Sequence, residues 1–317
     1  MSIPKSGLQL TRYEPSQRET WDRFVAQARN RSFLFSRDYI EYHGDRFVDH
    51  SIVVSRNGTV VALMPANQEG EILHSHQGLT FGGIIVAPKF RMEHALALVD
   101  ALVVYGRCNG LSRLVYRPAP HCYHLAPTEE DIVALLGAGA VISDTRGTSV
   151  LDLAAPTLRT PGRKRELSIA EASGLAISRD DDFAGFMSFC ARFLEQRHGA
   201  KPVHAGAEME RLAQRFDGNI KLYLARRADV VLAGVIAYDN PTCVRLQYVA
   251  SRDEGHRDGT VGLLYDHIIK DHCSVRRWLD FGPSVDPHTR AFNANLGFYK
   301  ESFGARTIAQ LTYQLAF

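Results

Sequence analysis

Residues 244–270 constrain the fold most, because an apolar run, a charged glycine-containing segment and an amphipathic segment follow one another there. Residues 244–250 are apolar and rich in strand-forming residues, which is typical of a buried strand. Residues 252–259 bring charges and glycines, and from Thr260 apolar residues recur at helical spacing. Strand, glycine loop and helix start place backbone N–H groups and the positive end of a helix dipole together. The stretch therefore predicts an anion site.

The side chains of this loop fit the same interpretation. Arg252 and Arg257 would add charge-assisted hydrogen bonds to a bound phosphate. Gly255 and Gly259 would let the phosphate approach the backbone closely, and Thr260 would begin the helix. The alternative is a surface turn ahead of an ordinary helix, so other parts of the chain have to decide.

Composition excludes several classes of protein. The 317 residues suffice for two domains of ordinary size, and 45% apolar content is that of a chain with a substantial core. With 37 basic against 35 acidic residues, charge gives no argument for a nucleic-acid or membrane partner. Five scattered cysteines predict reduced thiols and no metal site. The chain starts without a secretion signal and has no apolar run long enough to span a bilayer, so we expect a cytoplasmic protein.

The order of expected elements occurs twice along the chain. The segment at residues 60–66 corresponds to residues 231–237. The segment at 113–120, which begins with a predicted strand at 113–116, corresponds to 278–285. Within each copy, a strand and a long helical segment lie between these two segments. A repeat of domain size predicts two copies of one α/β unit, because each copy can then form its own sheet.

The boundary between the copies is expected within residues 154–166. This segment has two prolines, a glycine and a basic run without apolar periodicity, so it reads as a solvated connector. We therefore expect domains at 1–155 and 156–317. In the first copy, residues 86–90 stand where the glycine loop would be, and Pro88 lacks an N–H. The anion site is accordingly expected in the second domain, with a degenerate site in the first.

Several motifs resemble known acyltransferases. Arg252-x-x-Gly255-x-Arg257 is close to the loop that holds the coenzyme A pyrophosphate in GNAT acyltransferases, with arginine at a position that is usually small. Residues 293–305 resemble the GNAT closing motif, and more closely its version in FemAB-like acyltransferases. Residues 280–284 resemble a strand end of that group. Residues 42–47, 63–67, 75–83, 202–208 and 219–223 resemble tandem-GNAT proteins of surface-polysaccharide synthesis.

The resemblance covers most of the chain and implies both fold and activity. The implied fold is α/β, with two tandem GNAT-like units, each a mixed sheet flanked by helices. The implied activity is N-acylation of a nucleotide-linked aminosugar by acyl-CoA, in the synthesis of a surface polysaccharide such as O-antigen or capsule. The donor would be acetyl-CoA or a longer or hydroxylated acyl-CoA, and a homodimer is left open.

Transfer of an acyl group to an amine needs an oriented thioester and a proton acceptor. Backbone donors at Tyr248, Val249 and Ala250 could hold the thioester carbonyl. His204 is the first choice for the base, because imidazole titrates near neutrality. Glu208, one helical turn on, could orient it. His204 could instead cap the following helix.

The remaining candidates come from both halves of the chain. His76, in a glycine-flanked segment, is the rival base and a substrate-binding candidate. Asp280 ends a buried strand, where polar groups gather at the mouth of an α/β sheet. As a catalytic candidate it could hydrogen-bond sugar hydroxyls or accept from the acceptor ammonium, and the alternative is that it caps the loop. Ser284, which follows it, is a similar candidate. Gln247 is a further substrate candidate. It neighbours Tyr248 on the strand, so the two should face opposite sides of the sheet.

The GNAT resemblance adds three residues near the end of the chain. Tyr299 stands where GNAT enzymes often keep the tyrosine that protonates the leaving thiolate, although a core aromatic residue is an equal reading. Lys300 could contact a coenzyme phosphate as a point charge, and Asn295 is a further coenzyme candidate. Because no cysteine is placed as a nucleophile beside a base, direct attack of the amine is expected.

Two other functions remain open. One is a FemAB-type transferase that uses aminoacyl-tRNA to modify a peptidoglycan precursor. Such proteins usually carry a long helical arm and a basic surface, and the sequence has neither a heptad run nor a strong positive charge. The other is a non-catalytic GNAT duplicate that binds a nucleotide sugar.

Overall fold

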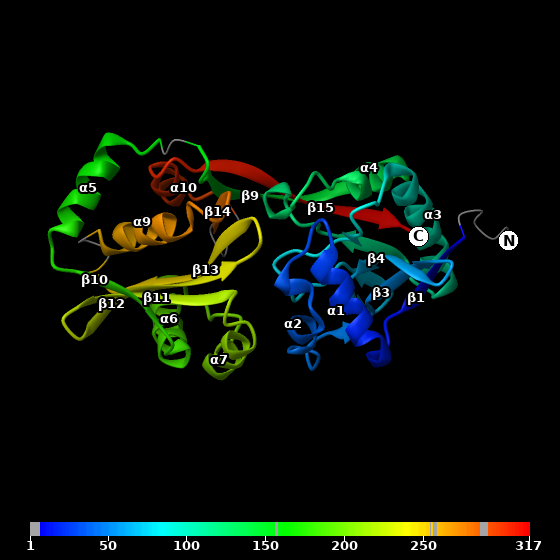
Figure 1. The fold of residues 1–317 in the computed structure, drawn as a ribbon, viewed down its shortest axis with the longest axis horizontal. Helices are drawn as coiled ribbons and strands as arrows, with labels where there is room; N and C mark the ends of the chain where they lie inside the picture. Colours follow the sequence, from blue (N-terminus) through cyan, green and yellow to red (C-terminus); the bar gives the residue numbers. More distant parts are fainter. Residues whose placement is uncertain (1–6, 156–157, 254, 256–258, 286–290) are drawn as a thin grey trace. The chain divides into compact units, whose positions relative to one another are not determined.

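The computed structural model describes residues 7–155, 158–253, 255, 259–285 and 291–317. The chain divides into two compact units, Met1–Arg146 with Ala309–Phe317, and Gly147–Ile308 (Figure 1). It passes from the first unit to the second within strand β9 (Val141–Asp152) and returns within β15 (Arg306–Ala316). The mixed α/β class expected from the sequence is confirmed. The division differs from the expected 1–155 and 156–317, because the last nine residues belong to the first unit.

The first unit combines a small antiparallel sheet with strands of a second, mixed sheet. The small sheet has the order β1-β3-β4-β7, and the other strands follow the order β15-β8-β6-β5-β2. Its strands are β1 (Leu8–Arg12), β2 (Val48–Asp49), β3 (Ile52–Arg56), β4 (Thr59–Met64), β5 (Asn67–Glu69), β6 (Ile72–His74), β7 (Ile85–Val86) and β8 (Arg113–Tyr116); its helices are α1 (Arg18–Gln27), α2 (Arg37–Glu41), α3 (Met92–Cys108) and α4 (Glu130–Gly137). Leu98 and Leu102 of α3 pack with Leu114 of β8 in the core.

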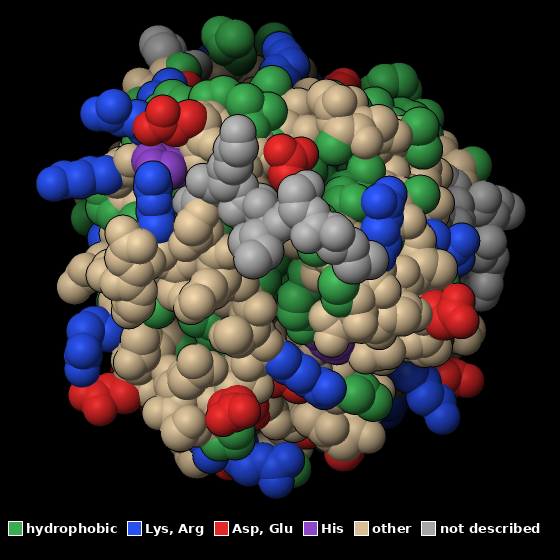
Figure 2. Space-filling view, turned by 90° about the vertical axis from the view of Figure 1, so that its right-hand side faces the viewer, with side chains coloured by type: hydrophobic (Ala, Val, Ile, Leu, Met, Phe, Trp, Pro, Cys, Tyr) green, Lys and Arg blue, Asp and Glu red, His purple; other side chains and the backbone are tan. Residues whose placement is uncertain are grey.

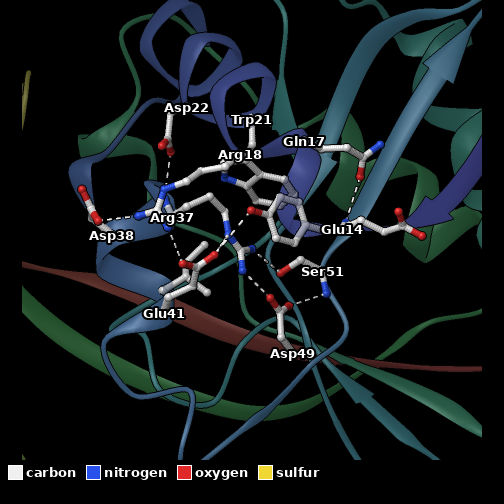
Figure 3. A network of polar contacts seen from close by, with 12 residues as sticks. Glu14, Gln17, Arg18, Trp21, Asp22, Arg37, Asp38, Glu41, Asp49 and Ser51 are labelled. Carbon is white, nitrogen blue, oxygen red and sulfur yellow. Dashed lines mark hydrogen bonds and ion pairs between the residues drawn. The ribbon is translucent and has the colours of Figure 1, made fainter.

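A buried guanidinium holds the first helices of this unit to its strands. Arg37 is ion-paired with Glu41 and Asp49 and donates to the Ser51 hydroxyl, as Figure 3 shows. Its guanidinium also lies 3.7 Å from the centre of the Tyr13 ring. A buried charge is tolerated when it is paired and hydrogen-bonded in this way.

The second unit has strands in the order β10-β11-β12-β13-β14-β9. Helices α9 and α10 lie on one face of this sheet and α6 and α7 on the other (Figure 1). The strands are β10 (Ala176–Asp180), β11 (Ile220–Arg227), β12 (Val230–Asp239), β13 (Cys243–Ser251) and β14 (Trp278–Pro283); the helices are α5 (Pro161–Glu171), α6 (Phe183–His198), α7 (Gly206–Arg215), α9 (Thr260–His272) and α10 (Ala294–Glu301). Leu264 and Ile268 of α9 pack on Val235 of β12.

The repeat expected from the sequence is present in the topology of each unit. In the first, β6 and β8 pair in parallel across helix α3, and β8 pairs antiparallel with β15. In the second, β13 and β14 pair in parallel across α9, and β14 pairs antiparallel with β9. Each unit thus has a strand–helix–strand crossover flanked by an antiparallel strand. Such a crossover is the usual way of joining parallel neighbours.

Residues 161–171 form helix α5, which overlaps the connector expected at residues 154–166. Thr160 caps the helix by accepting a hydrogen bond from the N–H of Arg163 at 3.3 Å, and Pro161 occupies the first turn. The basic run misled the prediction because Arg163 is buried. Its guanidinium lies 4.3 Å from the Tyr299 ring centre and 4.4 Å from that of Phe303.

The surface agrees with the near-neutral composition. On the face that Figure 2 draws, Lys and Arg side chains are interspersed with Asp and Glu. Among the helices of the described residues, none combines the length and apolarity needed to cross a bilayer.

Candidate functional site

Strands β13 and β14 form a fork in the second unit. They pair only where Cys243–Arg245 lies against Trp278–Asp280, although β13 continues to Ser251 and β14 to Pro283. On the other side of β13, Ile236 is opposite Tyr248 and Ala237 is opposite Leu246, so Gln247 is a bulge. A bulge bends its strand and re-aims side chains. The carboxyl ends of two parallel strands therefore separate here, which is where α/β sheets hold ligands.

A buried polar network fixes the base of this fork. Asp280 is 1% exposed and accepts hydrogen bonds from the Arg245 guanidinium at 2.6 Å, the Thr148 hydroxyl at 2.5 Å and the Gly282 N–H at 2.7 Å. Arg245 also donates to the Gln247 side chain at 3.0 Å. The Asp280 carboxylate, expected to contact a sugar or an ammonium group or else to cap its loop, already has three donors from the protein. The hydrogen bond from the Gly282 N–H is the capping contact. The observed contacts of Asp280 hold three strands in place.

Lys300 differs from the exposed phosphate-binding cation that the sequence analysis expected. It is 3% exposed, and its ammonium donates to the carbonyls of Gly282 at 2.9 Å and Pro283 at 2.8 Å. Burial lowers its pKa from 10.5 to about 8. Lys300 is buried because Gly297 and Lys300 lie on the face of α10 that points into the protein. Asn295 is exposed on the first turn of the same helix.

His204 and Tyr248 form a hydrogen-bonded pair beyond the fork. His204 is 4% exposed, and its Nδ1 lies 2.5 Å from the Tyr248 hydroxyl, which also accepts from the His204 N–H at 3.3 Å. Tyr248 was expected to act through its backbone, so this contact was missed. Glu208 accepts from the N–H of Ala205 at 2.7 Å and thereby caps α7. The bulge at Gln247 interrupts the strict alternation from which opposite faces for Gln247 and Tyr248 were expected.

The loop after β13 is partly engaged with its own sheet. The N–H of Arg252 donates to the Leu232 carbonyl at 2.8 Å, and its guanidinium donates to the Val231 carbonyl, also at 2.8 Å. A Cβ at Gly255 would lie 2.8 Å from the Leu232 carbonyl oxygen, so glycine is needed there for close packing. The expected role of these two residues at a phosphate is not visible in these contacts. Arg257 lies outside the described residues.

The start of α9 borders a pocket of about 490 Å³. Gly259 precedes the helix in the left-handed conformation, with φ of 70°. The Thr260 hydroxyl is buried and has no hydrogen-bond partner among the residues that the structure describes. The pocket is lined by Gly162, Arg165, Glu166, Ile169, Ser173, Arg227 and Gly259. Arg165 and Arg227 were not among the residues predicted from the sequence. A Thr-Pro helix start at residues 160–161 was the signal that could have revealed α5 and hence Arg165. Two guanidinium groups beside a helix N-terminus favour a phosphate.

Tyr299 lies close to the first turns of α9. A Cβ placed on Gly262 would be 3.5 Å from its hydroxyl oxygen. Burial raises the pKa of Tyr299 to about 12, against the opposing effect of the nearby Arg163 charge. The hydroxyl therefore stays protonated at neutral pH and remains available as a donor. Ser284 is buried directly after β14, and within the described part of the chain its hydroxyl has no hydrogen-bond partner.

His76 belongs to the first unit. It is 3% exposed and stacks on His43 with ring centres 5.0 Å apart. Burial and the neighbouring His43 lower its pKa to about 3, which makes the ring a weak proton acceptor at neutral pH. In the part of the chain that the structure describes, no three His, Cys, Asp or Glu side chains are grouped so that they could hold a metal ion.

Comparison with known proteins now assigns the second unit. Residues 159–290 match the family model described as an acetyltransferase (GNAT) domain, and this range contains the fork, the loop and α9. This part of the chain is a GNAT domain. No curated protein sequence matches the chain.

Several solved structures are similar to this chain over nearly its full length. FemX is 12% identical with a TM-score of 0.68, covering 98% of this chain and 97% of that one. L-PGS from Bacillus licheniformis is 11% identical with a TM-score of 0.61, covering 96% and 92%. A tandem GNAT protein from the clavulanic acid biosynthesis pathway is 13% identical with a TM-score of 0.50, covering 98% of both chains. These likenesses show a FemAB-like tandem-GNAT fold.

Proposed function

We propose that this GNAT protein transfers an acyl group from acyl-CoA to the amine of a nucleotide-linked aminosugar. The observation that carries the proposal is the fork between β13 and β14, which opens within the range matched by the GNAT model. A thioester can enter between separated strands and meet backbone groups of Tyr248–Ala250 that β14 does not use. Because FemX is only 12% identical, its structural similarity supports a shared fold and gives no reason to prefer an aminoacyl-tRNA donor.

The pocket beside α9 would hold the phosphates of the donor. Arg165 and Arg227 line it, and the N-terminus of α9 adds its dipole. Anchoring the phosphates at one end fixes where the thioester lies at the other. Correct orientation of two reactants can supply roughly 7–11 kcal/mol of the barrier.

The chemical step is direct attack by the amine. The nitrogen forms a bond to the thioester carbonyl carbon, the C–S bond breaks, and the coenzyme leaves as a thiolate that takes up a proton. His204, held by the Tyr248 hydroxyl, would accept the proton that the amine loses. Tyr299 would supply the proton to the thiolate, since its hydroxyl stays protonated at neutral pH.

The test is binding of acetyl-CoA to the purified protein, followed by thermal unfolding. A ligand at 100 times its Kd raises the free energy of unfolding by about 2.7 kcal/mol. We expect this stabilisation for the wild type, a loss of it in the Arg165→Gln, Arg227→Gln double variant, and its retention in Lys201→Gln, which changes an exposed lysine. No stabilisation of the wild type at millimolar acetyl-CoA or longer acyl-CoA would refute the donor.

The acceptor is tested separately by thiol release. Aminosugar nucleotides and the matching free aminosugars are each offered with acetyl-CoA. Turnover only with the nucleotide-linked amine would support the proposed acceptor. Turnover with aminoacyl-tRNA instead of acyl-CoA would replace the proposal by the FemAB-type alternative.

A further inference from the structure

The first unit repeats the crossover of the second, with β6 and β8 in the places of β13 and β14. Strands β6 and β8 pair in parallel over three positions, ending with His74 opposite Val115. Beyond them the two segments stay joined, because the Ser75 N–H donates to the Val115 carbonyl at 2.9 Å and the Arg117 N–H donates to the Ser75 hydroxyl at 2.8 Å. A pocket of the first unit is lined by residues of these segments.

This pocket is polar and has a volume of about 210 Å³. Apart from Val115, its lining residues carry hydrogen-bonding side chains, among them His76, Gln77, Arg117, Asp144, Arg146 and Thr312. Arg117 donates to the Leu79 carbonyl at 2.7 Å, which fixes its orientation, and Arg146 donates to Asp144 at 3.0 Å. Two guanidinium groups and one carboxylate leave a net positive charge, so the pocket favours an anionic ligand.

His76 adds an independent sign of function at this pocket. It has a positive φ of 69°, which is uncommon for a residue other than glycine. Among the described residues its Nδ1 has no hydrogen-bond partner, and its ring packs against His43 and Phe47. Strain and an unsatisfied buried polar atom both cost stability, and they persist at ligand sites where the ligand completes the hydrogen bonding.

The pocket is unsuited to the acyl donor. Helix α3, which follows β6 in the fold as α9 follows β13, begins after Arg91, whose N–H donates to the His94 side chain at 3.0 Å. The first donor of this helix is therefore already satisfied within the protein. With about 210 Å³, the pocket is also less than half the size of the one beside α9. Its ligand is smaller and richer in hydrogen-bonding groups than a coenzyme.

We propose that this pocket of the first unit binds a sugar phosphate, with Arg117 and Arg146 on the phosphate and with His76, Gln77 and Thr312 on the sugar hydroxyls. Charged groups, hydrogen-bond donors and hydrogen-bond acceptors line a space of monosaccharide size. The identification of this ligand as part of the acyl acceptor rests on the proposed function. The binding itself does not, because the pocket is complete within the first unit.

The test measures binding of glucosamine 1-phosphate to the full-length protein by calorimetry, without any acyl donor. Glucosamine and inorganic phosphate are the comparison probes. Loss of a hydrogen bond to a charged group lowers affinity by about tenfold or more. We expect that loss in Arg146→Gln and in Arg117→Gln, and unchanged binding in Arg56→Gln, which alters an exposed arginine of the same unit. His76→Asn should also weaken binding while tolerating the positive φ.

Each outcome decides the proposal. Tighter binding of the sugar phosphate than of either comparison probe, weakened by the pocket variants and not by Arg56→Gln, supports it. Equal affinity for inorganic phosphate would overturn the sugar part. Absence of binding at millimolar concentration, or equal binding by all variants, would overturn the site. If Arg117→Gln fails to fold because Leu79 loses its donor, Arg146→Gln and His76→Asn still decide. Acetyl-CoA stabilisation of the same samples shows whether the proposed function survives independently.

Discussion

Replacement of Lys300 by methionine should change how the stability of this protein depends on pH. Lys300 is buried on two carbonyl groups, and its pKa falls from 10.5 in the unfolded chain to about 8 in the folded one. Since one pKa unit corresponds to about 1.4 kcal/mol, folding disfavours the ammonium by about 3 kcal/mol. Below pH 8 both states are protonated, and the wild type carries this full cost.

The sign of the effect follows from proton uptake. Between pH 8 and 10.5 the unfolded chain holds a proton on Lys300 that the folded protein has released. The free energy of unfolding of the wild type should therefore rise with pH by about 3 kcal/mol relative to Lys300→Met. Methionine has a similar length and cannot titrate. The loss of its two hydrogen bonds is a constant offset that does not depend on pH.

The measurement is urea unfolding at pH 7 and pH 10.5, followed by fluorescence, to which Trp278 of β14 contributes. Other groups that titrate in this range are present in both proteins and cancel in the difference. Lys201→Met, which changes an exposed lysine, is the matched control. A wild-type minus Lys300→Met difference that stays constant across this range would refute the reasoning.

Three further predictions concern other parts of the chain. Arg37→Ala leaves Asp49 and Glu41 without their buried partner and should cost about 3–5 kcal/mol in chemical denaturation. Arg18→Ala, in the same cluster but 42% exposed, should cost less than about 1 kcal/mol, and equal losses would contradict the burial argument (Figure 3). Thr160→Ala should lower stability by about 1 kcal/mol and Thr160→Ser should not, since only the first removes the cap of α5; matching midpoints would disprove the cap. His204→Ala should reduce kcat about 100-fold with little change in acceptor KM and partial recovery at high pH; unchanged kcat would remove His204 from the mechanism.

The elements that the sequence predicted well are those whose own pattern carries the information. Apolar residues alternate along the strand predicted at 113–116 and recur at helical spacing from Thr260 onward. The structure has these elements as β8 and α9. Helix α5 was missed because Arg163 reads as solvated, whereas the rings of Tyr299 and Phe303, distant in sequence, bury it.

The candidate site was predictable only in outline. The start of α9 at Thr260 was located from the glycines and charges before it, but the direction of a side chain depends on partners elsewhere. The Lys300 ammonium points inward and donates to a carbonyl at the end of β14. The Tyr248 hydroxyl contacts His204 because the bulge at Gln247 changes which face of the sheet the Tyr248 side chain occupies. Arg165 and Arg227 reach their pocket from segments that carry no motif. Local pattern does not encode such long-range pairings.

The return of the last strand to the first unit has a consequence for synthesis. Residues 309–317 pair with β8, with Tyr313 opposite Tyr116 and Leu315 opposite Leu114. While the ribosome is still translating the second unit, β8 has an unprotected edge, and the nascent first unit cannot close its sheet. Exposed strand edges invite misassembly, so the early half depends on the late one or on a chaperone until translation reaches Phe317. Expressing residues 1–146 alone would reproduce that unfinished intermediate.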